Sequence, residues 1–378
     1  MIDVLALAKH RLVHGLVRDP LIVEPLVADQ WVIKSLLQKS IRRGEVESSQ
    51  RAALTLLAQK GSALWRRFII IAFEDVGAGS VDVVAMTVAA STDASWRKQS
   101  GGDAIIAAHL ARLLAEAPKS RSAEHLITGS NDHPSLEQER RLVSTSSIAE
   151  NLAAVADKSN SLTHRALAAW CVSGIGWQRE KKPGTDLPGL LDAYRSLGVP
   201  EELVVATGIA ATKSREPITL MVPLIWLAAY DGQAPTVVEA AVPWSPVLDD
   251  IPMYALDKHT RIGQEAIRSL VKYNSAIREF LERHVAPAQQ HKAAYMAAFY
   301  ADAAALASKL SWDGADQLEA LGTETDLLKV GVPVEQIRPL LQLFRTSVDH
   351  LNRLRAHIVC KKRGLVDVAT ILAADGEG

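Results

Sequence analysis

Cysteine is scarce in this chain: Cys171 and Cys360 are the only two among 378 residues. Two thiols are too few for a disulfide framework or for a four-thiolate zinc site. The start, Met1-Ile2-Asp3, also lacks the basic and then apolar pattern of a secretory leader. We therefore expect a reducing, cytoplasmic location.

Long hydrophobic runs and an excess of either charge are also lacking. The longest apolar stretch, 218–230, has 13 residues and contains Pro223, whereas a helix needs about 20 residues to cross a bilayer. Lys and Arg number 42 against 43 Asp and Glu, for a net charge of −1. We predict no membrane span. The charge balance excludes a globally basic nucleic-acid binder but not a local basic patch.

The apolar residues that are present repeat at helical spacing, and no convincing run of β-branched residues alternates between two hairpin turns. The sequence predicts an all-α fold, a multi-helix bundle with two helical subdomains. Aromatic residues make up only 5% of the chain, so Leu, Val, Ile and Ala must supply most of the packing. The expected helices include 62–75, 260–285, 288–310 and 335–360.

Proline-rich stretches mark the expected divisions of the chain. The polar stretch 178–188, which proline interrupts twice, is the predicted boundary between an N-terminal helical domain (1–177) and a C-terminal helical domain (188–378). Four prolines in 231–258 predict an irregular connector there. The apolar seam of 335–360 fits either an intrachain bundle or a subunit interface, and we favour the bundle.

Recognisable catalytic and metal-binding motifs are missing. The sequence has no Gly-x4-Gly-Lys-Ser/Thr loop, no Gly-x-Gly-x-x-Gly after a strand and no Gly-x-Ser-x-Gly elbow. His10 and His14 stand four residues apart, but no glutamate lies between them as a zincin motif requires, and we interpret them as surface histidines. We predict no catalytic residue, no metal and no cofactor from these patterns.

The cluster from Asp257 to Arg261 precedes a long amphipathic helix. Its Lys258, His259 and Arg261 stand where helix amides lack partners, which fits an anion or DNA contact. The alternative, which we favour, is that Asp257 and Thr260 cap the helix and that the cations belong to a solvated first turn.

The helix expected at 62–75 carries the strongest pattern. Leu64, Phe68 and Ile71 fall on one face, and the helix is apolar over most of its circumference, so it should be central. Two arginines lie in the first half of this helix, and two acids lie at its end. Buried charges need partners. We therefore expect a structural ion-pair network of Arg66, Arg67, Glu74 and Asp75 in preference to catalysis.

The order of elements in 39–77 resembles the region after the ATPase module of the RarA/MgsA family, replication-associated recombination proteins related to clamp loaders. The matching places are Lys39 to Arg42, Ala52 to Leu54, Arg66-Arg67 and Glu74 to Gly77. Phe73 stands where that family has serine, and residues 78–80 depart from its usual Leu-Ala-Asp-Pro. The AAA+ ATPase module would precede residue 39, so the resemblance concerns the C-terminal helical region only.

In that family the corresponding region is helical, helps to assemble a tetramer and works beside replication forks. The resemblance implies a non-enzymatic helical oligomerisation or adaptor protein associated with DNA replication, recombination or repair. Its expected partners are copies of itself and replication or recombination proteins. Two alternatives stay open: a direct DNA-binding protein that uses the N-terminal arginines Arg42, Arg43 and Arg51, and an unrecognised enzyme with a pocket between the helical halves.

Overall fold

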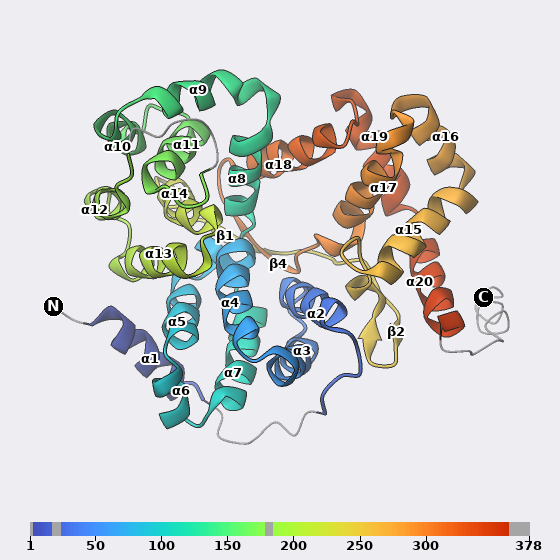
Figure 1. The fold of residues 1–378 in the computed structure, drawn as a ribbon, viewed down its shortest axis with the longest axis horizontal. Helices are drawn as coiled ribbons and strands as arrows, with labels where there is room; N and C mark the ends of the chain where they lie inside the picture. The colour runs from blue at the N-terminus through green and yellow to red at the C-terminus, as the bar shows by residue number, and fades with distance from the viewer. Residues whose placement is uncertain (1–2, 17–23, 178–183, 363–378) are drawn as a thin grey trace.

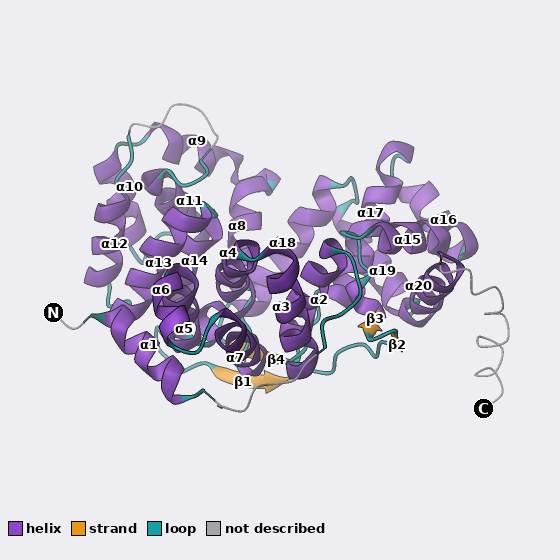
Figure 2. Ribbon diagram, turned by 60° about the horizontal axis from the view of Figure 1, so that its bottom comes forward, coloured by secondary structure: helices purple, strands orange, loops and turns teal. Residues whose placement is uncertain are grey.

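The computed structural model describes residues 3–16, 24–177 and 184–362. Twenty α-helices occupy these ranges, and four short strands lie among them (Figures 1 and 2). The predicted all-α, multi-helix class is confirmed.

The helices follow one another closely along the chain. The first fourteen are α1 Val4–His14, α2 Gln30–Arg42, α3 Val46–Lys60, α4 Ser62–Ile71, α5 Val81–Thr92, α6 Ala94–Gln99, α7 Asp103–Glu116, α8 Ser122–Asp132, α9 Glu137–Thr145, α10 Ile148–Ala156, α11 Leu162–Ser173, α12 Leu187–Ser196, α13 Glu201–Ser214 and α14 Met221–Ala229. The last six are α15 Arg261–Tyr273, α16 Ser275–His284, α17 Gln290–Ala298, α18 Ala315–Lys329, α19 Val334–Arg345 and α20 Val348–Lys362.

Two hydrophobic cores divide the molecule. The larger core contains buried residues from Ala8 to Leu256 together with Leu310 and Leu318, and the smaller one contains buried residues from Ala266 to Ile358. Figure 1 shows the corresponding halves side by side, with α15–α17, α19 and α20 on the right. Apart from Leu310 and Leu318, which pack in the larger core, the two cores separate along the chain at 257–265. The boundary predicted at 178–188 lies partly outside the described residues, and 184–256 packs with the N-terminal half.

The most apolar stretch of the chain is an interior helix. Residues 221–229 form α14, in which Leu224 and Ile225 are fully buried. Within the described ranges, no helix combines the length and the apolarity that a bilayer crossing requires.

Two of the long helices that the sequence predicts are each broken once. The segment 260–285 divides into α15 and α16 at Asn274, whose side chain accepts a hydrogen bond from the Ile277 amide and caps α16. Asparagine competes for backbone groups in this way and favours such caps over helix interiors. The segment 335–360 likewise divides into α19 and α20.

The predicted helix 288–310 ends early. It becomes α17, then a π-helical turn at Phe299–Ala303, and then the strand β4 at Ser308–Ser311. This strand pairs antiparallel with β1, Thr236–Glu239, so that Thr236 lies opposite Ser311. A second small sheet joins β2, Val247–Leu248, to β3, Ile251–Pro252. The pairing of β1 with β4 links the proline-rich connector to the C-terminal half, whereas β2 and β3 both lie within the connector.

Helices α8 and α18 cross closely and join the two halves. Gly322 of α18 lies directly against His125 of α8, where an added Cβ would stand 2.8 Å from the His125 Cα. Gly129 of α8 meets Leu321 in the same way, at 2.6 Å from a side-chain methyl carbon. The missing side chains therefore permit the two backbones to approach. Figure 1 shows α18 reaching from the right half toward α8.

Candidate functional site

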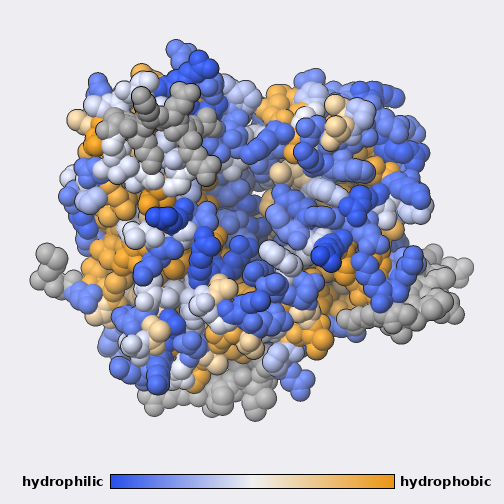
Figure 3. Space-filling model, in the orientation of Figure 1, coloured by the Kyte–Doolittle hydropathy of each residue, from blue (hydrophilic) through white to orange (hydrophobic). Residues whose placement is uncertain are grey.

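Charged side chains gather where the two cores meet. Three of them come from the last turn of α2 and the residue that caps it, namely Lys39, Arg42 and Arg43, and they are at most 7% exposed. Their positive charges also lie at the negative end of the helix dipole. Helix α2 is fixed at its other end by Asp29, whose side chain accepts from the amides of Trp31 and Val32. In Figure 3, hydrophilic residues fill the hollow between the two halves.

Arg42 pairs with both acids that follow α4. Its Nε lies 2.6 Å from an oxygen of Asp75, and its Nη2 lies 2.8 Å from Glu74. Gln38 donates to the other oxygen of Asp75 at 2.8 Å. Arg121, just before α8, lies 3.5 Å from Asp75. Asp75 is completely buried, so these donors replace the water that a carboxylate otherwise requires.

The two acids stand on a π-helical turn, Ala72–Val76, that continues α4 and ends at Gly77 with φ of 49°. Turns of this type widen the helix and are frequent at functional sites. Here the turn directs Glu74 and Asp75 toward α2 and α8.

The second ion-pair group is built on the other π-helical turn, Phe299–Ala303. Asp302 is fully buried, and one of its oxygens lies 2.8 Å from Nη2 of Arg43. Its other oxygen lies 2.6 Å from Nη1 of Arg355, which comes from α20 and is 1% exposed. Arg355 also donates to Asn352 at 2.7 Å. One carboxylate thus holds two arginines from opposite ends of the chain.

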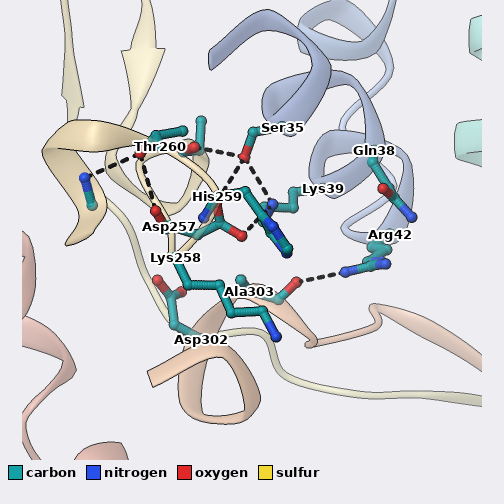
Figure 4. Close-up of polar contacts among 12 residues, drawn as sticks. Ser35, Gln38, Lys39, Arg42, Asp257, Lys258, His259, Thr260, Asp302 and Ala303 are labelled. Carbon is teal, nitrogen blue, oxygen red and sulfur yellow. Dashed lines mark hydrogen bonds and ion pairs between the residues drawn. The ribbon is translucent and has the colours of Figure 1, made fainter. Parts of the chain in front are cut away.

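The third group joins α2 to the loop before α15 (Figure 4). Lys39 Nζ lies 2.8 Å from Asp257 and donates to Ser35 at 2.8 Å, while Ser35 donates to the Ala255 carbonyl at 2.6 Å. Burial lowers the pKa of Lys39, although the Asp257 carboxylate opposes this shift. Burial alone would raise the pKa of Asp257, but Lys39 and His259 outweigh it, and the pKa is lowered. Asp257 is therefore ionised at neutral pH.

The remaining residues of the predicted 257–261 cluster are placed differently from one another. Thr260 caps α15 by accepting from the Gly263 amide at 3.0 Å, as the favoured alternative predicts. Lys258 is half-buried, with its amine 3.0 Å from Met296 Sδ and 4.3 Å from the centre of the Phe299 ring. Burial lowers the pKa of Lys258. His259 and Arg261 are exposed.

The sequence prediction that Arg66 and Arg67 pair with the acids at the end of α4 is wrong. Arg66 lies 3.1 Å from Glu216 on the surface, and Arg67 donates to Gln38. Glu74 and Asp75 do belong to a buried ion-pair network, but Arg42 and Arg121 supply its positive charges.

The predicted DNA contacts on the N-terminal arginines need a similar correction. Arg42 and Arg43 are 2% and 7% exposed and are bound to acids, so they cannot reach a phosphate group. Arg51 is paired with Asp250 at 3.0 Å, and its side chain is 20% exposed.

A cavity of about 470 Å³ lies beside the network, between α8, the Phe299–Ala303 turn and α18. Arg121, His125, Tyr300 and Lys309 line it. Burial and the neighbouring Arg121 charge lower the pKa of His125 to about 3, so this imidazole is neutral at pH 7. A pocket between the halves is one of the sequence alternatives, but its lining by α8 was not predicted, because 117–134, which contains α8, has the breakers of a loop in its sequence.

The chain was compared with protein-family models, with curated proteins and with solved structures. None of them matches it. Within the described ranges, no three His, Cys, Asp or Glu side chains come together as metal ligands. The buried carboxylates of Asp75, Asp257 and Asp302 each have a cationic partner within 2.8 Å. Acids bound in this way connect the elements that carry them.

Proposed function

We propose that this protein is a non-enzymatic helical adaptor that assembles with copies of itself and serves DNA replication, recombination or repair. The assignment to DNA replication, recombination or repair is supported by the resemblance of 39–77 to the RarA/MgsA family. The non-enzymatic part is supported by the closed ion pairs of the network, which lock the two halves into one relative position. A cytoplasmic location fits the scarcity of cysteine, since the chain has only two and both are buried.

Assembly is supported by apolar side chains exposed at the start of α2. Val27 is 92% exposed and Trp31 is 60% exposed. Val27 also lines a groove of about 150 Å³ together with Leu248 and Ile251, and the adjoining Val247 is 62% exposed. Exposed aromatic and aliphatic side chains grouped in this way are typical of protein interfaces. A second copy of the chain is the occupant that the family resemblance favours.

The measurement that tests this proposal is the mass in solution. At micromolar concentration we expect light scattering to give a multiple of 40.9 kDa. The double variant Val27→Ser and Trp31→Ser should shift the mass toward the monomer, because it removes the apolar groove edge. Leu142→Ser is a matched control, since Leu142 is 56% exposed on the distant helix α9. A monomeric wild-type protein would contradict the assembly proposal.

Direct binding to nucleic acid is a second candidate, and it is favoured by a surface of which the sequence prediction included only Arg261. Helices α15 and α20 run antiparallel, with Lys362 paired to Glu265 at 2.8 Å. Each presents exposed basic side chains at helical spacing, namely Arg261, Arg268 and Lys272 on α15 and Arg353, His357 and Lys361 on α20. We call this surface the α15–α20 face. Tyr273, 64% exposed, lies in the groove between the two helices with His350 and Arg353.

Cations that follow a groove with an exposed aromatic ring are the features that bind single-stranded nucleic acid. We expect a fluorescently labelled oligonucleotide to bind with an affinity that falls steeply as salt rises. The double variant Lys272→Glu and Arg353→Glu should weaken binding by about tenfold or more and reduce the salt dependence. The control Arg141→Glu reverses a charge on α9, 79% exposed, and should have little effect. If the double variant and the Arg141→Glu control weakened binding equally, the loss would come from overall charge and not from the α15–α20 face.

A further inference from the structure

The two histidines near the end of α1 face each other. Nε2 of His10 lies 3.0 Å from Nε2 of His14, and the ring centres are 4.2 Å apart. Both residues are exposed on the solvent side of α1. Two histidines at this four-residue spacing on one helix can direct two imidazole nitrogens at a single point.

The helix that carries the pair is held firmly against the molecule. Ala8 and Leu12 of α1 are buried in the larger core, at 3% and 1% exposure. Arg11, between the two histidines, forms ion pairs with Asp82 at 2.6 Å and Glu202 at 3.1 Å. The backbone beneath the two imidazoles is thus fixed by packing and by charge, as a preorganised ligand pair requires.

The separation of the two nitrogens fits a bound metal ion. With metal–nitrogen bonds of about 2.0–2.1 Å, nitrogens 3.0 Å apart subtend an angle of roughly 90–95° at the metal. An angle near 90° belongs to square-planar, tetragonal or octahedral coordination, whereas a tetrahedral site requires a wider one. Nitrogen and oxygen ligands in tetragonal geometry select Cu²⁺ or Ni²⁺.

We propose that His10 and His14 form a divalent transition-metal site with Cu²⁺ or Ni²⁺ as the favoured ion. The two Nε2 atoms are the protein ligands, and water fills the positions that face solvent. The metal bridges two successive turns of α1. This inference is independent of the proposed adaptor function, because neither the network nor the α15–α20 face takes part in it.

Titration of the full-length, untagged protein with CuCl₂ or NiCl₂ tests the site. Calorimetry should show one ion bound per chain, and His10→Ala or His14→Ala should each weaken that binding by at least about tenfold. The Cu²⁺ electron paramagnetic resonance spectrum should show two imidazole nitrogens in the wild type and one in either variant. His357→Ala removes an exposed histidine from α20 and should change neither result.

Two outcomes would overturn the proposal. One is the absence of saturable binding, in which case the 3.0 Å contact is an ordinary hydrogen bond between neutral imidazoles. The other is unchanged stoichiometry and spectrum in His10→Ala, which would place the bound ion elsewhere. Circular dichroism of each variant checks that α1 and the rest of the fold are retained.

Discussion

Replacing Asp302 with alanine should lower the free energy of unfolding by about 3–5 kcal/mol, the cost of leaving a buried charge without its partner. The carboxylate is 0% exposed and binds Arg43 and Arg355, which are themselves 7% and 1% exposed. Its loss leaves two guanidinium groups in the interior without their acidic partner, beside the space that the carboxylate had filled. The effect is large because the C-terminal half contacts α2 through this residue.

Chemical denaturation followed by circular dichroism measures the change. Asp316→Ala is the control, since it removes the same group from a site where the side chain is 97% exposed, and it should change stability by less than about 1 kcal/mol. Adding Arg355→Met to Asp302→Ala should recover part of the loss, because it removes one of the stranded charges. Equal stabilities of Asp302→Ala and Asp316→Ala would show that the buried pairs contribute little.

The pattern in the sequence predicted the centre of the fold well. Leu64, Phe68 and Ile71 recur on one helix face, and all three are fully buried. The burial of Asp75 and its need for positive charge follow from the same helix. Such features depend on local periodicity, which a single sequence contains.

The partners of the acids could not be predicted in the same way. Seven-residue spacing places Arg67 and Glu74 on one side only if the α-helix continues, but a π-helical turn begins at Ala72. The turn rotates Glu74 away from Arg67 and toward Arg42, which is 32 residues earlier in the chain.

Contacts between the halves depend on still longer separations. The pairing of β1 with β4 joins residues about 70 positions apart, and α8 meets α18 at Gly322. Neither strand has the alternating pattern of a half-buried sheet, since every residue of β1 is exposed. The sequence pattern therefore does not predict these two strands.

The two neighbouring acids on the first π-helical turn should differ sharply in how much each contributes to the free energy of unfolding. Asp75→Ala is expected to lower the free energy of unfolding by about 3–5 kcal/mol, since it strips Arg42 of a fully buried partner. Glu74→Ala should cost about 1 kcal/mol, because the Glu74 side chain is 20% exposed and water can replace part of what it loses. Both variants remove one negative charge from the same turn, so total charge cannot account for a difference between them.

Double-mutant cycles then identify the true partner of Asp75. Combining Asp75→Ala with Arg42→Ala should be strongly non-additive, with a coupling of about 1–3 kcal/mol, since the two side chains are in contact. The cycle with Arg67→Ala should give a smaller coupling, because Arg67 acts on Asp75 only through Gln38. Larger coupling to Arg67 than to Arg42 would restore the sequence prediction, in which Arg66 and Arg67 supply the positive charges for Glu74 and Asp75.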